Sequence, residues 1–358
     1  MSAATTTVPA DARPVGRPLT ANRLPKRAPA AVAAGSIALG CAIGALGGLE
    51  SHLQWGLISA LLFLAISYGL AARVEGRRQA KDRFATSVVW VAFILAVVPL
   101  IALTVYTVQQ GAAVVDGNFL THSMKGVLQA GPGGGIYHAL IGTLQQVLLA
   151  TAMAAPIGLL TAVYLVEYGR GRLAKAVTFF VDVMTGVPSI VAGLFVLSLW
   201  NVALGFNYSG FSGAIALAIL MMPVVVRSTE EMLKLVPNEL REASYALGVP
   251  KWKTILRIVL PTAIGGITTG LMLAVARITG ETAPVLMLVF GADYINSNPF
   301  DGPQQSLPMY IWQQYAMVNN DYGYARAWGA ALVLIAFVMG LNLIARGIAR
   351  WRSPKGGH

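Results

Sequence analysis

Eight apolar runs, each long enough to cross a membrane as a helix, recur along the chain. A transmembrane helix needs about twenty consecutive, mostly apolar residues. Only 11% of the residues are charged, whereas a soluble domain carries about 25%. The runs cover approximately residues 31–49, 53–72, 86–108, 137–165, 176–204, 211–226, 258–290 and 325–344. We therefore predict an all-α polytopic membrane protein surrounded by membrane lipid.

Lysine and arginine residues gather between alternate apolar runs and at both ends of the chain. Short cytosolic loops are enriched in these residues, so the pattern predicts that both termini lie in the cytosol. The net charge of +11 does not indicate a nucleic-acid partner. That interpretation would require basic side chains gathered on one folded face, and here they follow the loops.

Residues 1–30 are rich in Ala, Pro and Thr and carry several basic side chains. With so little apolar content to bury, they are predicted to form a disordered basic cytosolic tail. A cleaved signal peptide is not expected, because its apolar core would begin nearer Met1. Cys41 is the single cysteine, so the chain alone can form neither a disulfide nor a cysteine cluster. We expect no metal and no cofactor.

The segment between the sixth and seventh apolar runs is too long for a simple turn. Ser228, with Glu231 three residues later, fits a capping box and predicts a short helix that ends at Pro237. Asn238 is the predicted cap of a second helix, and Gly248 marks where that helix stops. A helix of this length is marginal in water, so it needs a surface to lie on.

This segment also contains a spaced motif: E-A-A, three residues, G, nine residues, I-x-L-P, with Ser in place of the second Ala. Its residues are Glu242, Ala243, Ser244, Gly248, Ile258, Leu260 and Pro261. The motif resembles the cytosolic coupling motif of ABC importer permeases. The resemblance implies that residues 228–257, which we call the coupling loop, dock on a separate ATPase subunit. The alternative is an amphipathic helix that rests on the membrane surface.

Further stretches resemble one type of these permeases, the PstA type of the bacterial phosphate-specific ABC importer. They are "DVMTGVPSIVAGLF" from Asp182, "MPVVVRSTEEMLKLVP" from Met222 and "ARITGETAPVL" from Ala276. The resemblance begins near Gly134 and continues to the C-terminus. It implies a six-span permease domain over residues 85–358, preceded by two extra spans and a basic loop over residues 31–84.

The resemblance also implies a function and a set of partners. The chain would be one membrane half of an importer of the bacterial inner membrane that carries phosphate by alternating access. Its partners would be a PstC-type permease, two copies of a PstB-type ATPase and an extracytoplasmic PstS-type phosphate-binding protein. The chain has no nucleotide-binding motif, so it is not expected to be an enzyme itself.

Arg277 and Glu281 are the only ionisable side chains in the apolar run 258–290. An arginine at the centre of a span costs about 2.5 to 3.5 kcal/mol, so something must compensate for its charge or use it. Four residues apart on a helix, the two side chains would share one face. Either they neutralise each other, or they line the path, with Arg277 binding the anion and Glu281 holding Arg277 in place. Pro284 predicts a bend or break near Glu281.

Arg227 is a second candidate for the path, at the cytosolic end of the sixth run. It is either a plain cytosolic anchor or, as the resemblance implies, a residue that receives the anion near the inner exit. Asp182 is expected to pair with Arg172 or Lys175 of the neighbouring basic loop. Two other functions remain open: a permease of the same architecture for sulfate or molybdate, and a stand-alone secondary transporter that couples to an ion.

Overall fold

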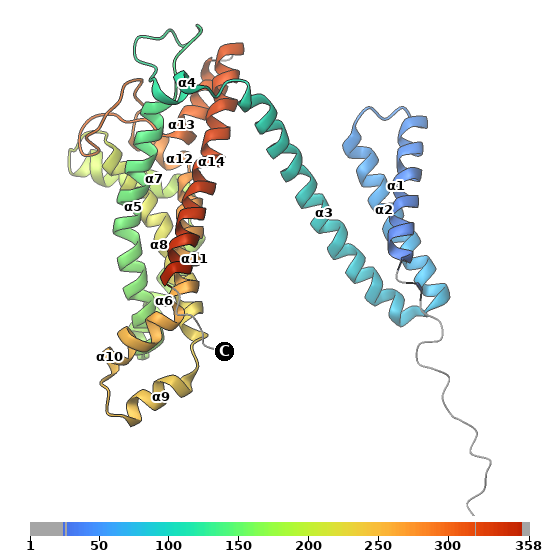
Figure 1. The fold of residues 1–358 in the computed structure, drawn as a ribbon, viewed down its shortest axis with the longest axis horizontal. Coiled ribbons are helices and arrows are strands. Elements are labelled where there is room, and N and C mark those ends of the chain that lie inside the picture. Colours follow the sequence, from blue (N-terminus) through green and yellow to red (C-terminus); the bar gives the residue numbers. More distant parts are fainter. Residues whose placement is uncertain (1–23, 26, 319, 353–358) are drawn as a thin grey trace, which may run out of the picture. The chain divides into compact units, whose positions relative to one another are not determined.

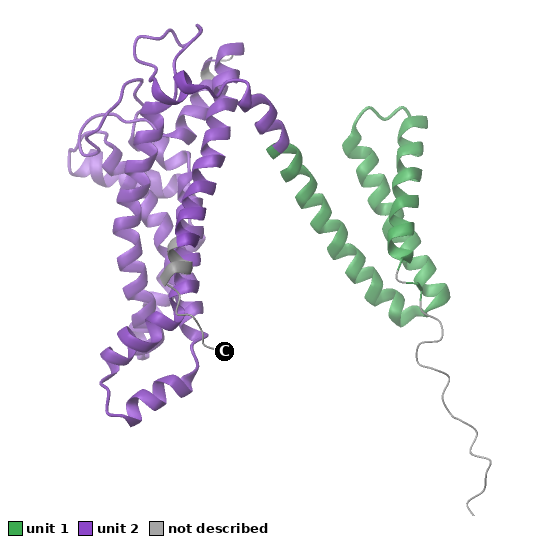
Figure 2. Ribbon diagram, viewed as in Figure 1, with its two compact units in different colours: residues 1–104 green, residues 105–358 purple. Residues whose placement is uncertain are grey.

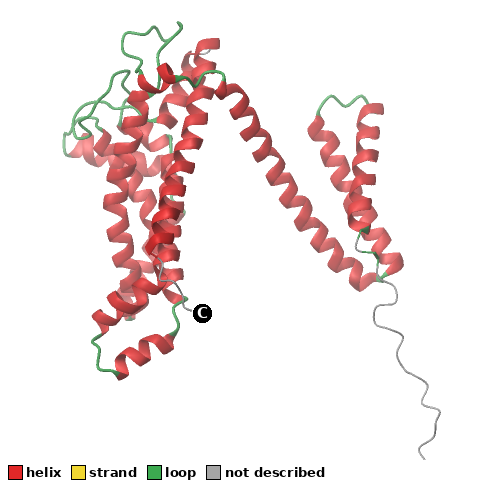
Figure 3. Ribbon diagram, viewed as in Figure 1, coloured by secondary structure: helices red, strands yellow, loops and turns green. Residues whose placement is uncertain are grey.

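The computed structural model describes residues 24, 25, 27–318 and 320–352. Within them every regular secondary-structure element is a helix (Figure 3). Two isolated β-bridges are the only strand-like pairings among the described residues. Residues 1–23 and 26 of the predicted tail, residues 1–30, lie outside the described residues, and a helix already begins at Ala28, before the predicted end of the tail. The prediction of an all-α polytopic membrane protein is confirmed. Helices suit this composition because they satisfy their backbone hydrogen bonds internally, which a bilayer requires.

Seven helices in the described part of the chain are long and apolar enough to span a membrane (Figure 1). They are α1 (Ala28–Leu46), α2 (His52–Val74), α3 (Arg77–Ala112), α5 (Tyr137–Val163) with η1 (Tyr164–Tyr168), α8 (Gly210–Lys234), α10 (Lys251–Thr254) with η3 (Ile255–Val259) and α11 (Leu260–Thr279), and α14 (Asp321–Arg352). The shorter elements are α4 (Gly117–Thr121), α6 (Gly171–Thr185), α7 (Ser189–Val196), η2 (Leu197–Ala203), α9 (Asn238–Ala246), α12 (Ala283–Leu288), α13 (Leu307–Trp312) and η4 (Gln313–Val318). Segments η1 to η4 are π-helical.

The chain forms two compact units, residues 1–104 and residues 105–358 (Figure 2). The division falls inside α3, so the third apolar run contributes to both units. The boundary at residue 85 that the sequence suggested stays a prediction.

Unit 1 is built on the close approach of α1 and α2. The buried residues of α1 are Ser36, Gly40 and Gly44, which recur every four residues on one face. A Cβ atom at Gly40 would lie 2.1 Å from Ser59 Oγ, and one at Gly44 would lie 2.4 Å from the Trp55 ring. Small residues at this spacing let two helix backbones pack tightly in a membrane, where the hydrophobic effect does not drive helices together.

Unit 2 is centred on α5 and α8, which pack against each other along their lengths. Small residues again permit the contact: a Cβ atom at Gly158 of α5 would lie 2.7 Å from Val225 Cγ1 of α8. Helix α8 is the most enclosed of the spanning helices, with 67% of its most apolar stretch buried. Side chains of α7, α11 and α12 complete the apolar core around this pair. The core therefore holds α8 and α11 in place. Arg227 lies in α8, and Arg277 lies in the last turn of α11.

The predicted fifth span, residues 176–204, is not one continuous helix. Helices α6 and α7–η2 are bent by 107° at a break of a few residues. Gly186 caps the end of α6, and Pro188 precedes the first residue of α7. Proline has no N–H to donate, and it disfavours helical backbone in the residue before it, so the helix stops here. Counted as one span, the bent pair brings the crossings in the described residues to eight.

The predicted helix start at Ser228 is wrong. Helix α8 continues past this residue, and Ser228 Oγ donates a hydrogen bond to the carbonyl oxygen of Val224, at 2.8 Å, in the preceding turn. A serine that bonds back to its own helix does not cap a new one. The predicted second helix exists as α9, although Pro237 occupies the N-cap position and Asn238 is already helical. Gly248 ends it as predicted, with a φ of +73°.

At the end of unit 2 opposite α9, a buried arginine organises the glycine-rich loop before α5. Arg326 of α14 is 4% exposed, and its guanidinium donates to the carbonyl oxygens of Gln129, Gly131 and Gly133. The Arg326 guanidinium gives these backbone acceptors a donor inside the fold, as buried polar groups require. The Gly-rich stretch is therefore a linker held in place by Arg326.

Candidate translocation and coupling sites

The break predicted near Glu281 is confirmed. Helix α11 ends at Thr279, Gly280 caps it, and the short helix α12 begins at Ala283. Gly280 N–H donates to the carbonyl oxygen of Arg277 at 3.3 Å, which tightens the last turn. Arg277 is thus in the final turn of one helix, and Glu281 lies in the connection to the next. The prediction that the two side chains share one helical face is wrong, because the helix ends between them.

Arg277 and Glu281 also differ in their surroundings. Arg277 is exposed and Glu281 is half-buried. In the described residues neither side chain forms a hydrogen bond or an ion pair. If Arg277 and Glu281 only neutralised each other, their charged groups would lie in contact. The Arg277 charge is therefore open to contact from outside the chain.

Arg227, near the end of α8, is in the opposite situation. Its guanidinium pairs with Asp182 of α6 and donates to Glu230 Oε2 at 2.7 Å. Glu230 is in turn paired with Lys234 at 2.6 Å. Two cations and two carboxylates give this cluster no net charge. The expected partners of Asp182, Arg172 and Lys175, are corrected to Arg227.

The coupling motif lies on the surface of unit 2, at the end away from α4 and α13 (Figure 1). In α9, Glu242 and Ala243 are exposed, whereas Ser244 is buried and its Oγ lies 2.8 Å from Thr254 Oγ1. The exposed side of this segment is partly apolar, since Leu247 is 83% exposed. Ile258 belongs to η3, while Leu260 and Pro261 begin α11. The motif residues thus run directly into the helix that carries Arg277.

A buried ion pair fixes α9 to the end of α5. Arg241 donates from Nε and Nη2 to Glu167 Oε1, at 3.0 and 2.9 Å. The side chains are only 12% and 5% exposed. Lys251 of α10 donates to the backbone carbonyl of Glu167, and its ammonium lies 4.9 Å from the centre of the Tyr168 ring. These contacts join the coupling loop to η1.

Sequence reasoning missed Glu167, Arg241 and Lys251. Glu167 and Arg241 are 74 residues apart. A lone glutamate beside an apolar run and an arginine in a polar helix carry no local pattern that would pair them. The one available signal was Glu167 itself, a carboxylate at the end of a predicted span.

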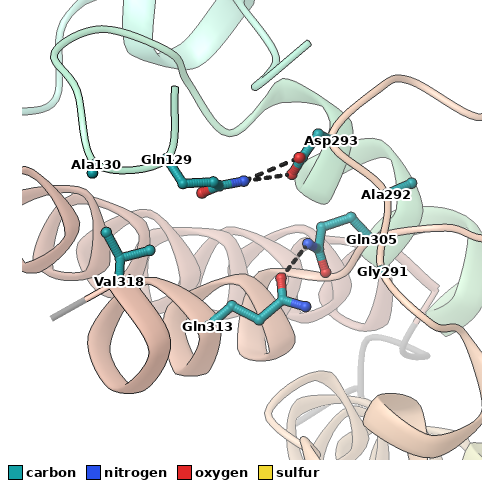
Figure 4. Close-up of a pocket in the computed structure, with 8 residues that line it drawn as sticks. All are labelled: Gln129, Ala130, Gly291, Ala292, Asp293, Gln305, Gln313 and Val318. Atoms are coloured by element: carbon teal, nitrogen blue, oxygen red, sulfur yellow. Dashed lines mark hydrogen bonds between the residues drawn. The ribbon is translucent and has the colours of Figure 1, made fainter. Parts of the chain in front are cut away.

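A polar pocket lies at the end of unit 2 opposite α9 (Figure 4). Its volume is about 490 Å³. Gln129 Nε2 donates to both carboxylate oxygens of Asp293, at 3.0 Å each, and Gln305 Nε2 donates to Gln313 Oε1 at 2.8 Å. Two loops and η4 therefore meet through amide and carboxylate side chains.

Comparison with known proteins assigns this arrangement to a family. Residues 154–355 match the family described as the binding-protein-dependent transport system inner membrane component. The phosphate transport system permease protein PstA 1 of Mycobacterium tuberculosis strain H37Rv is 53% identical over 271 residues, which are 75% of this chain and 87% of that relative. The chain belongs to this family, as a PstA-type permease. PstA of Mycobacterium leprae is 52% identical over 75% of this chain and 89% of that relative.

Among solved structures, this PstA-type permease is similar to the MetNI methionine ABC transporter in an inward-facing conformation. The identity is 18% and the TM-score 0.49, over 61% of this chain and 94% of that one. Family membership and the apolar helices make the PstA-type permease a multi-pass protein of the inner membrane. In its described residues no group of three or more His, Cys, Asp or Glu side chains could hold a metal ion.

Proposed function

We propose that the chain is one membrane half of an ATP-driven phosphate importer that works by alternating access. The observation that carries the proposal is its 53% identity to PstA 1, whose name assigns it to phosphate transport, over 87% of that protein. Phosphate is an anion with several acceptor oxygens, and a guanidinium offers a planar fork of donors that suits them. An exposed arginine without a carboxylate partner is therefore the group to expect along its path.

Arg277 is the proposed anion ligand. Its position in the last turn of α11, directly before a break, leaves its guanidinium free of carboxylates in the described residues. Glu281, in the connection that follows, keeps the site weak enough to release its cargo. Arg227 is the proposed second contact near the inner exit. Because Arg227 is held by two carboxylates, phosphate reaches it only in competition with them.

The coupling loop, residues 228–257, is the proposed contact with the ATPase subunit, a PstB-type protein present in two copies. The surface that supports this role combines Glu242 and Ala243 with the exposed side chains of Leu240 and Leu247. Serine at position 244 turns inward instead, toward Thr254. Movement of α9 would pass to α5 through the Arg241–Glu167 pair and to α11 through Ile258, Leu260 and Pro261.

The proposed importer also defines the domains, partners and orientation of the chain. Residues 85–358 would form the permease domain, and residues 31–84 would add two spans before it. A PstC-type permease would supply the second half of the pathway, and a PstS-type protein would deliver phosphate from outside. Both termini would face the cytosol, as the distribution of basic residues indicates.

The test is phosphate uptake into proteoliposomes that contain this chain with its two proposed membrane and ATPase partners and the binding protein. We expect uptake that requires ATP and is not reduced by excess sulfate or molybdate. Competition by either oxyanion would assign the permease to that anion. Uptake that continues without the ATPase would instead indicate a secondary transporter and would contradict the proposed coupling.

A further inference from the structure

Unit 1 contains an apolar groove between α1, α2 and the first part of α3. Its volume is about 1020 Å³, which matches the upper end of the about 300 to 1,000 Å³ typical of small-molecule sites. Ile37 of α1, Phe63 of α2 and Ile94 of α3 are among its apolar lining residues. All of the residues that line it belong to unit 1. The groove is therefore a feature of one compact unit.

The groove is not uniformly apolar. Ser67 Oγ and Ser87 Oγ lie 3.3 Å apart on its α2 and α3 walls. Ser59 Oγ donates back to its own helix, at the carbonyl of Trp55, so it leaves no unpaired donor in the wall. These hydroxyls are satisfied within the unit. The interior thus offers van der Waals contact to a hydrocarbon chain and makes no strong demand for a polar ligand.

One end of the groove is basic. Arg83, which lines the groove there, donates from Nη2 to Glu75 Oε1 at 2.6 Å, and the Glu75 side chain is only 2% exposed. Those two charges cancel. The neighbouring basic side chains are exposed and form no ion pair within the described residues; they are Arg73, Arg77, Arg78 and Lys81. Asp82, also exposed, offsets one of these four charges, so three positive charges are left over in the segment that flanks Arg83.

We propose that this groove binds an anionic phospholipid, with its acyl chains between the three helices and its phosphate at the basic end. Clusters of four or more Lys and Arg next to a transmembrane helix attract anionic headgroups. Here the cluster flanks Arg83, which lines the apolar groove, so one ligand satisfies both features. A zwitterionic lipid would fill the groove equally well but would gain little from the unpaired cations. The site therefore selects by headgroup charge.

The chain's only cysteine provides a direct test. Cys41 is exposed and lines the groove. Bound acyl chains would cover its thiol, so phosphatidylglycerol added to the delipidated full chain in detergent should slow modification by N-ethylmaleimide at least fivefold. Phosphatidylcholine at the same concentration should slow it much less. Equal rates with the two lipids would overturn the headgroup selectivity.

Charge variants test the basic end. Arg77→Gln, Arg78→Gln and Lys81→Gln together should weaken phosphatidylglycerol protection at least tenfold, since each basic residue contributes a factor of about five near an anionic headgroup. The matched control removes the same charge from unit 2 and comprises Arg170→Gln, Arg172→Gln and Lys175→Gln. It should retain protection. Equal loss in both variants would show that only total charge matters, which contradicts a site in unit 1.

A filling variant tests the groove itself. A Cβ atom at Gly56, which lines the groove, meets no other atom within 4 Å, and the same is true at Gly69 of the same helix, which does not line it. Gly56→Trp should remove the bound phosphatidylglycerol seen by native mass spectrometry, whereas Gly69→Trp should keep it. Retention in Gly56→Trp would place the lipid outside the groove. If the native chain retains no lipid, the groove is left for a protein helix and the proposal fails.

Discussion

Two regions of unit 2 differ in whether their arginine side chains form ion pairs. In the first region, around α9 and the end of α8, Arg241 is paired with Glu167 and Arg227 with Asp182 and Glu230. In the second, at the break after α11, Arg277 has no such partner in the described residues. Paired charges hold elements together. An unpaired arginine in an apolar run has a cost that only a ligand or a partner would offset.

The two regions differ in backbone as well. The π-helical segments η1 and η3 both contact α9, and Glu167 of η1 and Ile255 of η3 are buried. At the break after α11, Ile278 and Val285 are buried in the apolar core, whereas Arg277 is exposed and Glu281 lies in the connection between the two helices. We propose that the first region transmits movement and that the second exposes a charge.

The largest effect should follow from breaking the buried pair. Arg241→Gln leaves Glu167 without its cation in a site where both side chains are nearly buried. Loss of one partner of a buried pair destabilises a protein by about 3 to 5 kcal/mol. We expect a clear fall in the melting temperature of the detergent-solubilised protein, together with loss of ATP-driven uptake.

Adding Glu167→Gln to Arg241→Gln is the control, because it removes the uncompensated carboxylate and should restore most of the melting temperature. If Arg241→Gln alone melts like the native chain, the pair does not hold α9, and the first region is not the rigid connection described above.

The next effect concerns Arg277. Arg277→Gln should lower phosphate uptake about 10- to 100-fold, because hydrogen bonds to charged groups contribute about 1.5 to 3 kcal/mol. Its melting temperature should hardly change, since the side chain is exposed and has no partner in the described residues. Arg277→Lys should be partly active, as it keeps the charge and loses the planar fork. Uptake per assembled complex is the measurement.

The double variant Arg277→Gln with Glu281→Gln decides between anion binding and simple neutralisation. It should stay inactive if Arg277 contacts phosphate. Full recovery of uptake would mean that the two charges matter only to each other, and Arg277 would then belong with the paired residues of the first region.

The sequence predicted the second region better than the first. The break near Glu281 followed from Gly280 and Pro284, whose effects on the backbone are local. The end of α9 at Gly248 followed in the same way, from a residue that tolerates a positive φ. Spanning helices were predictable because their apolar length is set by the bilayer.

Contacts between distant segments could not be predicted in this way. Glu167 meets Arg241 only because α5 and α8 pack together and place η1 beside α9. Ser228 fitted a cap by spacing, yet its hydroxyl had a second local partner, the Val224 carbonyl, inside a continuous helix. The bend at Pro188 was overlooked because the apolar run continues through it. At Ser228 and at Pro188 the sequence allowed either a continuous helix or a break, and the tertiary structure decided between the two.

Two helix-ending glycines provide a smaller test across the same two regions. Gly248 has a φ of +73° and Gly280 a φ of −93°. Left-handed backbone costs an L residue about 1 to 2 kcal/mol, so Gly248→Ala should weaken the end of α9 and lower ATP-driven uptake. Gly280→Ala should be nearly neutral, because an added Cβ would meet only the Arg277 carbonyl, at 3.9 Å. Equal effects of the two substitutions on uptake would remove the distinction between these helix ends.

The smallest effect is expected for Arg227, whose pairs are partly solvated. Its side chain is 30% exposed and that of Asp182 is 59% exposed, so we expect Arg227→Gln to cost about 1 kcal/mol or less. Lys234 still pairs with Glu230 in that variant.

If the cluster is only structural, Arg227→Gln combined with Asp182→Asn should restore native stability and native uptake, because no carboxylate is left without its cation. If Arg227 also receives phosphate near the inner exit, the double variant should regain stability while its uptake stays low. Measuring melting temperature and uptake on the same preparation separates the two outcomes, and full recovery of both would place Arg227 wholly among the structural charges of the first region.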